Sequence, residues 1–410
     1  MRIVLEKPIL NENENENENN ETVESAACEA VIAAEGEVNK DAPSFRGLVK
    51  GAPLGAKIMF GFTLFSLLIY AVAIFVTPFA DFFNENVASY VRMALAKATS
   101  FTRASISEMV IIMMPVLIGA FIFVVTFIFK KASDEAVIRF YVYAFAIILL
   151  FFSLFVFTYG TGYRSSSIDE KLSLDRKEVS AQELADTAQY LADRMNELSE
   201  EIPYDYQSFS IMPYSFEELN NKLNDAYSKA AKKYDFILGF SSKLKCVNFS
   251  SVMSNLHVLG MYTYYTGEAN INMDWPDYSR PFTCAHEMAH QRGISREDEA
   301  NFMAYLVCLE SDDPYIRYSA YYNVFEYVAN SLYAADSDAY MEVINSLSLP
   351  IRYEMSAYAA FFEQYRESKA AVVNDKINDI SLKANGQKAG SRSYDLVTDL
   401  AVAYILHSEK

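Results

Sequence analysis

Cysteine and histidine are both scarce in this chain of 410 residues, with four of each. Four cysteines in a chain of this length do not make a disulfide framework. None stands in a C-x-x-C spacing, which argues against a zinc site built from cysteine pairs. We expect Cys284 and Cys308 to be buried free thiols, with a disulfide between them as the alternative.

Basic charge is also in deficit. The chain has 35 Lys and Arg against 53 Asp and Glu, a formal net charge of −18. Nucleic-acid binding needs a basic face, so that class of function is excluded. No apolar run follows Met1 directly, so no N-terminal signal peptide is expected. The hydrophobic fraction of 52% and charged fraction of 21% are typical of a protein partly in lipid.

The N-terminal region is of low complexity. Residues 11–21 read NENENENENNE and offer no apolar face to bury. Such an alternating tract can arise by repeat slippage and needs no function. We predict that residues 1–54 form a disordered tail.

Three long uncharged runs follow, at residues 58–80, 109–129 and 140–163. Each reaches the ~20 residues that a helix needs to cross the hydrocarbon core of a bilayer. Residues 55–163 are therefore predicted to be a membrane region with three transmembrane helices. Aromatic residues suited to the membrane interface lie near the ends of the runs, namely Tyr70, Tyr141, Tyr143 and Tyr159.

Basic residues predict the orientation of these helices. On one side of the membrane, basic residues are dense before the first run and in the short loop between the second and third runs: Arg46, Lys50, Lys57, Lys130, Lys131 and Arg139. On the other side, fewer basic residues are spread over a longer loop and the end of the third run: Arg92, Lys97, Arg103 and then Arg164. The positive-inside rule places the tail in the cytoplasm and residues 164–410 outside it. Residues 81–108 are expected to form either an amphipathic helix along the interface or a folded loop.

Residues 164–410 are predicted to be a mostly helical α+β domain. Two segments begin with capping boxes, at residues 180–202 and 215–234. Residues 257–267 are rich in β-branched and aromatic side chains, which favours a strand. Residues 266–272 are expected either to be an edge strand that pairs with an extended peptide or to be a loop.

Two of the four histidines stand in an H-E-x-x-H motif, from His286 to His290. Pro281 suits the first turn of a helix, and such a helix places the two histidines one turn apart on one face. Their imidazoles can then bind one zinc ion. Glu287, at the edge of that face, is the expected general base that takes a proton from zinc-bound water.

Three glutamates compete to be the third ligand. Gly293 is expected to end the first helix, and Ser295 to cap a second one. Glu297 opens an E-x-x-A-N pattern, in which Asn301 shares its face and is expected to contact a ligand histidine. Glu297 is the preferred ligand. The alternatives are Glu326, which opens a second E-x-x-A-N, and Glu299.

The E-x-x-A-N segment resembles the E-x-x-[AS]-[DN] segment of zinc peptidases with two His and one Glu ligand, although here the glutamate follows His290 much more closely. Position 296 is Arg, so the third histidine of metzincins is missing. From about residue 55 onward the chain resembles a bacterial membrane family, domain of unknown function 3810. Residues 267–306 and the SYDLVTDLAVAY segment near the C-terminus carry this resemblance. It implies three membrane spans followed by a zincin-like metallopeptidase domain.

The leading hypothesis is a multi-pass cell-membrane peptidase that uses Zn²⁺ and an extracytoplasmic domain. Its expected partners are the lipid bilayer and a peptide or protein substrate of the membrane or envelope. The alternative is a non-catalytic sensor or scaffold with a structural zinc site. A protease with its zinc inside the bilayer is disfavoured, because the polar run from His290 to Glu299 is costly in hydrocarbon.

Overall fold

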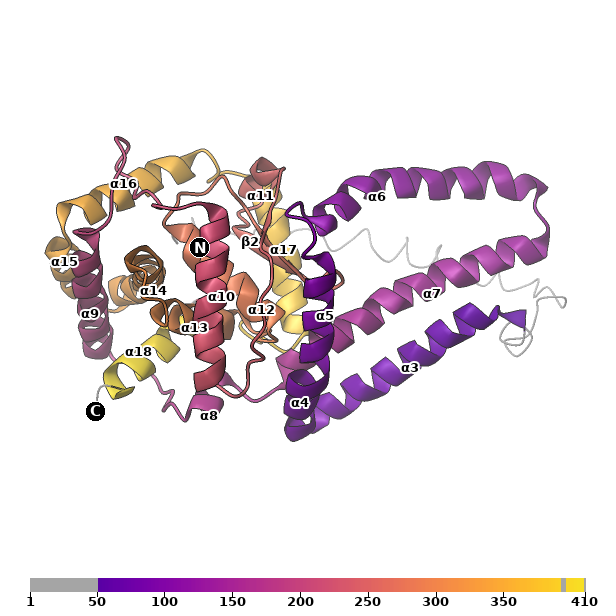
Figure 1. Cartoon of the computed structure of the whole chain (residues 1–410), viewed down its shortest axis with the longest axis horizontal. Coiled ribbons are helices and arrows are strands. Elements are labelled where there is room, and N and C mark those ends of the chain that lie inside the picture. Colours follow the sequence, from indigo (N-terminus) through magenta and orange to yellow (C-terminus); the bar gives the residue numbers. More distant parts are fainter. Residues whose placement is uncertain (1–50, 392–395, 409–410) are drawn as a thin grey trace, which may run out of the picture.

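The three apolar runs form three long helices that project from one side of a helical domain (Figure 1). The structure, a computed structural model, describes residues 51–391 and 396–408. The predicted tail lies almost wholly outside these residues. The long helices are α3 (Leu54–Phe75), α6 (Ile106–Phe123) and α7 (Asp134–Thr158). Each is long and apolar enough to cross a membrane, which confirms the prediction of a mainly α membrane protein.

The helix ends differ from the ends of the uncharged runs. The first run breaks at Val76, and α4 (Thr77–Phe83) begins there because Pro78 fits the first turn of a new helix. The second helix continues beyond α6 through η2 (Val124–Ile128) and η3 (Phe129–Lys131). The third ends at Thr158 and is followed by the 3₁₀ turn η4 (Gly160–Arg164).

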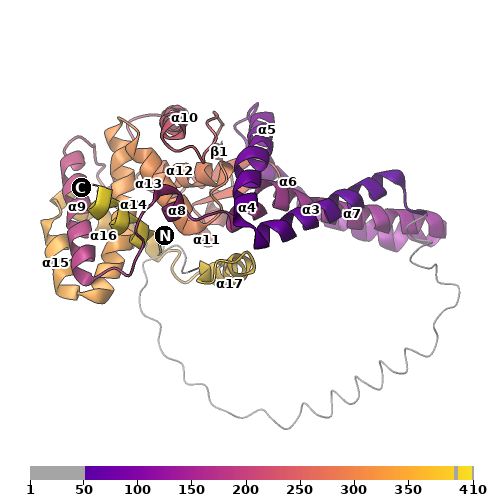
Figure 2. The same ribbon diagram turned by 90° about the horizontal axis from the view of Figure 1, so that it is seen from below.

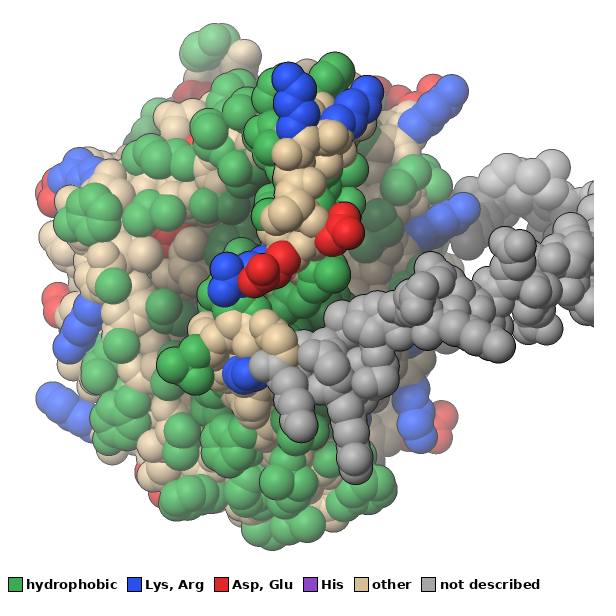
Figure 3. Space-filling view, turned by 90° about the vertical axis from the view of Figure 1, so that its right-hand side faces the viewer, with side chains coloured by type: hydrophobic (Ala, Val, Ile, Leu, Met, Phe, Trp, Pro, Cys, Tyr) green, Lys and Arg blue, Asp and Glu red, His purple; other side chains and the backbone are tan. Residues whose placement is uncertain are grey.

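The long helices pack unequally. Helices α3 and α7 lie against each other, with Ser153 donating to the Thr63 hydroxyl at 3.2 Å. Helix α6 stands apart, and no residue in its apolar window is buried. Viewed from the projecting end, hydrophobic side chains cover much of the surface around a small group of charged ones (Figure 3). The sides of α3, α6 and α7 expose many large hydrophobic side chains, which suits helices that meet lipid.

The segment between the first two long helices is helical and packs on the domain. It comprises α4, the π-helix η1 (Asn84–Ala88) and α5 (Ser89–Thr99). Helix α5 contacts both the small sheet and the helix of the H-E-x-x-H motif. Asn84 and Arg92 are buried there, so this segment forms part of the domain's folded core.

The sheet has three short strands in the order β1–β3–β2. They are β1 (Lys245–Cys246), β2 (Gly260–Thr263) and β3 (Glu268–Ile271); β3 pairs parallel with β1 and antiparallel with β2. The prediction of an edge strand at residues 266–272 is therefore wrong. Strand β3 is central and fully buried, because β1 pairs with its other side. The outer strand is β2.

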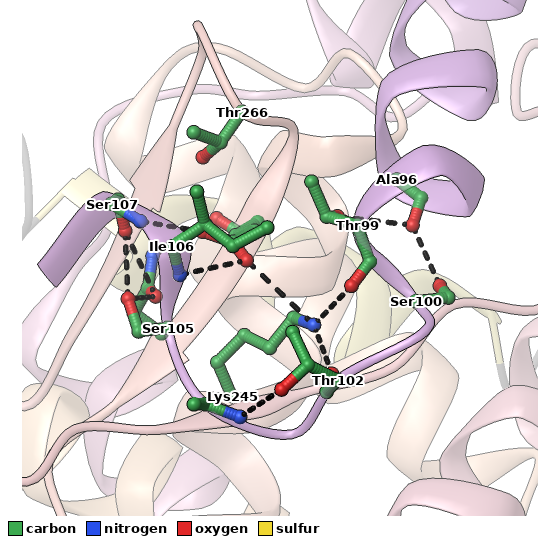
Figure 4. A network of polar contacts seen from close by, with 12 residues as sticks. Ala96, Thr99, Ser100, Thr102, Ser105, Ile106, Ser107, Lys245 and Thr266 are labelled. Atoms are coloured by element: carbon green, nitrogen blue, oxygen red, sulfur yellow. Dashed lines mark hydrogen bonds and ion pairs between the residues drawn. The ribbon is translucent and has the colours of Figure 1, made fainter. Parts of the chain in front are cut away.

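A polar network joins the sheet to the start of α6 (Figure 4). The Glu268 carboxylate accepts from the backbone N–H groups of Ile106 and Ser107 at 3.1 and 2.9 Å. A carboxylate in this position also stabilises the positive end of the helix dipole. The Lys245 ammonium lies 3.6 Å from Glu268 and donates to the Thr99 carbonyl at 2.6 Å. The central strand thus fixes the first turn of a helix that is long and apolar enough to cross a membrane.

The rest of the domain is helical. In chain order its helices are α8 (Ile168–Leu172), α9 (Ala181–Ser199), α10 (Phe216–Lys233), α11 (Ser250–Asn255), α12 (Ser279–Gln291), α13 (Glu297–Leu309), α14 (Pro314–Ala335), α15 (Ser337–Ser346), α16 (Leu349–Glu363), α17 (Lys369–Ala384) and α18 (Val397–Ser408). Of these, α12 is the helix of the H-E-x-x-H motif. Helix α14 packs against α9, α12, α13 and α18 to form the main core. Figure 2 shows α17 on the opposite side of the domain from α10.

Several local predictions are confirmed. Ser180 with Glu183, and Ser215 with Glu218, form the expected capping boxes at the starts of α9 and α10. Strand β2 lies within the predicted strand at residues 257–267. The cysteines at 284 and 308 are buried free thiols.

Candidate metal centre

Helix α12 places the two histidines of the motif side by side. It begins at Ser279, two residues before the expected start, and is buried from Pro281 to Gln291. The rings of His286 and His290 lie 4.5 Å apart, centroid to centroid, and are nearly perpendicular at 88°. One turn of helix therefore presents both imidazoles to the same point.

A glycine turn brings the next helix back against α12. Gly293 has φ +99°, and a Cβ there would lie 2.1 Å from Arg92 Nη2, so only glycine fits. Helix α13 then begins at Glu297. The expected cap, Ser295, is wrong: the N-cap is Arg296, which makes no side-chain cap bond. The Ser295 hydroxyl instead donates to the Tyr159 carbonyl at 2.9 Å.

Glu297 completes a three-residue cluster. Its Oε2 lies 3.3 Å from His286 Nε2 and 3.4 Å from His290 Nε2. One ligand atom from each of the three residues lies within 4.8 Å of the others, an arrangement that can hold a metal ion. Burial alone would raise the pKa of Glu297, but His290 and His286 outweigh it and hold that pKa well below its usual value. The carboxylate is therefore ready to bind a cation.

The donor set and its surroundings fit zinc. His290 Nδ1 lies 2.7 Å from the Ile294 carbonyl, which calls for a proton on Nδ1 and leaves the Nε2 lone pair free for a metal. Two imidazoles and one carboxylate form the protein ligand set of several catalytic zinc sites, in which the fourth position is open to water.

The competing glutamates lie elsewhere. The Glu299 carboxylate accepts from the Ile168 amide at 3.1 Å and from Arg296 Nη1 at 2.7 Å, so it is engaged in contacts away from the two histidines. Glu326 lies on α14 close to buried tyrosines, where burial raises its pKa to about 8. Neither belongs to the metal-binding cluster found among the described residues.

Asn301 lines the same cavity as the cluster, but its side chain bonds to a different residue from the one that we expected. Its Nδ2 donates to the Tyr327 hydroxyl at 3.3 Å, whereas we expected it to contact a ligand histidine. Both side chains line the cavity. Helix α14, which carries Tyr327, contacts both α12 and α13, so Asn301 links the second metal helix to it.

Glu287 lines the cavity and lies directly against strand β2. A Cβ added to Gly260 would lie 2.6 Å from Glu287 Oε1 and 2.7 Å from its Cγ, so the glycine makes room for this side chain. Its other oxygen, Oε2, has no hydrogen-bond partner among the described residues. Burial raises the pKa of Glu287, against the opposing charges of the two histidines. A raised pKa and an unpartnered oxygen suit a group that takes up protons.

Tyr159, which the sequence suggested only as an interfacial aromatic, reaches the metal cluster. It directly follows the last residue of α7. Its hydroxyl lies 3.1 Å from His290 Nδ1 and donates to the Ser295 carbonyl at 3.2 Å. This contact spans 131 residues of sequence, and no local pattern could have indicated it.

Arg92 and Asn84 donate hydrogen bonds to the backbone of the glycine turn. The sequence did not indicate these contacts either. Arg92 donates to the carbonyls of Thr158 at 3.1 Å, Arg292 at 3.3 Å and Asn84 at 3.0 Å. Asn84 Nδ2 donates to the Gly293 carbonyl at 3.0 Å. Burial lowers the pKa of Arg92 to about 10, so the guanidinium stays charged at neutral pH.

The cluster opens into a cavity of about 530 Å³. Strand β2 and the residues before it form one wall, and α17 forms another. The lining includes His257, Val258, Leu259, Gly260, Met261, Tyr262, Asn374, Asp375, Ile377, Asn378 and Ser381. The His257 Nε2 lies 2.7 Å from the Tyr365 carbonyl. The metal cluster is therefore open to a space large enough for a short peptide segment.

A model of the family described as "Protein of unknown function (DUF3810)" matches residues 83–402. The chain belongs to this family. Comparisons with curated proteins and with solved structures found no match. The range matched by the DUF3810 model contains α6, α7 and the metal cluster, and also Arg92, Tyr159 and Gly260. Helix α3 precedes it.

Proposed function

We propose that this DUF3810 protein is a zinc-dependent peptidase anchored in the cell membrane. The observation that carries the proposal is the cluster of His286, His290 and Glu297, open to a cavity that Glu287 also lines. Three protein ligands beside a carboxylate with a raised pKa are what metal-assisted hydrolysis requires.

The residues of the chain would act as follows. His286, His290 and Glu297 would hold zinc, which when bound lowers the pKa of a coordinated water to about 7 and polarises a carbonyl. Glu287 takes a proton from the attacking water and returns it to the leaving nitrogen. Tyr159 and the Ile294 carbonyl orient His290 through its Nδ1. Gly260 leaves the space in which the Glu287 carboxylate moves between these roles.

The outer strand supports a peptide as substrate. Strand β2 pairs with β3 on one side, and residues 259–262 line the metal cavity. An extended peptide can add to such an edge through backbone hydrogen bonds. This assigns to β2 the role that we expected for residues 266–272.

The topology that we propose follows from the basic residues. The tail and the loop between α6 and α7, which carries Lys130 and Lys131, lie in the cytoplasm. The three long helices cross the membrane, and residues 164–410 lie on its outer side. A labelling experiment with a membrane-impermeant thiol reagent on cysteines placed in each loop tests this arrangement.

The decisive test compares Glu287→Gln with wild type in the full-length protein. Both should bind about one zinc per chain, whereas hydrolysis of a casein-derived peptide mixture should fall by about 10²–10⁴-fold in the variant. His286→Ala should lose the zinc. Glu342→Gln, an exposed glutamate on α15, is the matched control and should behave as wild type.

Two results would contradict the proposal. Full hydrolysis by Glu287→Gln would remove the general base. A wild-type protein that binds zinc but hydrolyses no peptide would favour the alternative, a sensor or scaffold with a structural zinc. In that case His286→Ala should unfold the domain, which circular dichroism would detect.

A further inference from the structure

We propose that the substrate is a protein chain anchored in the same bilayer, and that it is cut within about six residues of the hydrocarbon boundary. This rests on the proposed peptidase function and on the three long helices crossing the membrane. It adds a substrate class that the metal cluster alone does not imply.

The metal cluster lies at the end of a membrane-crossing helix. Helix α7 ends at Thr158, and the next side chain, Tyr159, lies 3.1 Å from His290 Nδ1. The helix has 25 residues. At ~1.5 Å per residue it is roughly 37 Å long, against ~30 Å for the hydrocarbon core. The last turn of α7, and the metal cluster beside it, therefore lie at the level of the lipid headgroups.

The hairpin between β2 and β3 touches the same helix. The Thr158 hydroxyl donates to the Tyr264 carbonyl at 3.2 Å. The Tyr264 ring packs on Phe155 at 5.5 Å and the Tyr265 ring on Phe151 at 5.7 Å. Tyrosines packed on the last turns of a spanning helix are typical of the membrane interface. The tip of the hairpin thus marks the boundary of the bilayer.

The direction of β2 follows from its two ends. Gly260, at its start, faces the Glu287 carboxylate, and Thr263, at its end, precedes the hairpin tip on α7. Four extended residues span roughly 10–13 Å. A chain that pairs with the outer edge of β2 therefore runs from the proposed general base toward the bilayer. Its membrane anchor would begin a few residues beyond the scissile bond.

The wall opposite β2 has an apolar rim. Helix α17 exposes Val373, Ile377 and Ile380, with 57%, 62% and 67% of each residue accessible. They recur at positions that share one face of the helix, and Ile377 also lines the metal cavity. An exposed apolar stripe beside a cavity marks a surface that meets apolar chain or lipid. A segment emerging from a bilayer supplies that apolar chain.

The position of the cavity relative to the membrane is fixed by the packing. Arg92 joins the Thr158 carbonyl at the end of α7 to the Arg292 carbonyl at the glycine turn. Glu268 holds the first turn of α6 on the central strand. Because both attachments are buried, the cavity cannot swing far from the bilayer surface to reach soluble proteins.

The test uses full-length protein with zinc in vesicles of phosphatidylethanolamine and phosphatidylglycerol. The probe is one designed transmembrane helix of about 20 Leu and Ala residues, followed by an uncharged linker of mixed sequence. The linker has about 30 residues, roughly 100 Å when extended. The same linker without the helix is the matched control. Mass spectrometry locates the cuts and their rates.

We expect cuts concentrated in the first six or so linker residues, and cleavage at least about tenfold faster than that of the free linker, because tethering raises the effective concentration. Cuts spread evenly along the linker, or equal rates for the two probes, would overturn the proposal.

A second measurement does not depend on hydrolysis. A photo-reactive benzoylphenylalanine replaces Met261 on the outer strand, which is 37% exposed, in a Glu287→Gln background. It should cross-link to linker residues next to the anchor, and the same label at Tyr206, 93% exposed, should not. Cross-links only to distant linker residues, or none, would count against the docking. Correct cross-links without hydrolysis by wild type would reject the peptidase and leave the docking intact.

Discussion

The two walls of the metal cavity are built differently. The wall of β2 belongs to a sheet whose central strand is buried along its whole length. The opposite wall, α17, buries only Ala371 and Leu382 of its 16 residues. The proposed zinc peptidase would need its metal, base and water held in one geometry, while its polymer substrate would have to enter and leave. The fixed wall carries the first requirement, and the weakly buried wall is suited to the second.

The fixed wall is secured by residues that precede the domain in sequence. Glu268 binds the start of α6, Tyr159 at the end of α7 contacts His290, and Arg92 holds the glycine turn. The predicted division at residue 164 therefore separates the metal helices from contacts that support them. Experiments on residues 164–410 alone would omit Arg92 and Tyr159, which is why each test uses the full chain.

The largest effect is expected from Arg92→Met. The change removes donors from three buried carbonyls and should cost about 3–5 kcal/mol of folding free energy. Thermal unfolding in detergent, followed by tyrosine fluorescence, measures it. Arg103→Ala is the control, because this arginine of the same segment pairs with Glu217 on the surface and should contribute less than about 1 kcal/mol. Equal losses of folding free energy in both variants would show that the buried hydrogen bonds of Arg92 contribute no more than a surface ion pair.

Gly260→Ala tests the space beside the proposed base. The new Cβ would lie 2.6–2.9 Å from the carboxyl end of Glu287, so that side chain must move. We expect kcat to fall about 100-fold, as for an ångström-scale displacement of a reacting group, with zinc content unchanged. Gly61→Ala on α3 is the control, because its new Cβ would meet no described atom within 4 Å beyond its chain neighbours and the backbone of its own helix. Unchanged kcat in Gly260→Ala would mean that Glu287 needs no fixed position.

Tyr159→Phe removes one hydroxyl from the contact between α7 and His290. The Ile294 carbonyl remains as a partner for Nδ1, so the loss should be partial. We expect the zinc dissociation constant to rise about tenfold, measured by competition with a chelator. Tyr264→Phe, which keeps its packing on Phe155, should leave the zinc affinity unchanged. A loss as large in Tyr264→Phe would point to disturbed packing in place of the His290 contact.

Local sequence patterns predicted the metal cluster but not its supports. His286, His290 and Glu297 lie within one helix, one glycine turn and the next helix, so helical spacing and the left-handed preference of glycine are enough to bring them together. The long apolar runs predicted the three helices for the same reason: length and composition decide whether a helix can cross a membrane.

Contacts between distant segments escaped prediction. Arg92 reaches the Arg292 carbonyl across 200 residues. A lone basic residue in a mixed loop gives no sign of such a partner. Strand β3 is central because it also pairs with β1, and β1 has only two residues, too few for a pattern that would show which strand it joins. Sequence reveals which residues share a face of a helix or strand. Strand order and buried hydrogen bonds between distant segments depend on how whole elements pack.

The smallest effect is expected on the α17 wall. Asn374 Nδ2 donates to the Leu256 carbonyl at 3.2 Å, and Asn374→Ala removes this link to the domain. The folding free energy should fall by no more than about 1 kcal/mol, because the freed carbonyl can bind water. Hydrogen exchange should nevertheless quicken in α17 and stay unchanged in β2, since weakly buried elements open separately from the core. Asn385→Ala is the control, because among the described residues the Asn385 side chain bonds at the end of α17 itself, to the Ser381 carbonyl. Faster exchange in β2 as well would show that the two walls open as one unit. Access to the metal cluster would then require the β2 wall to open together with α17.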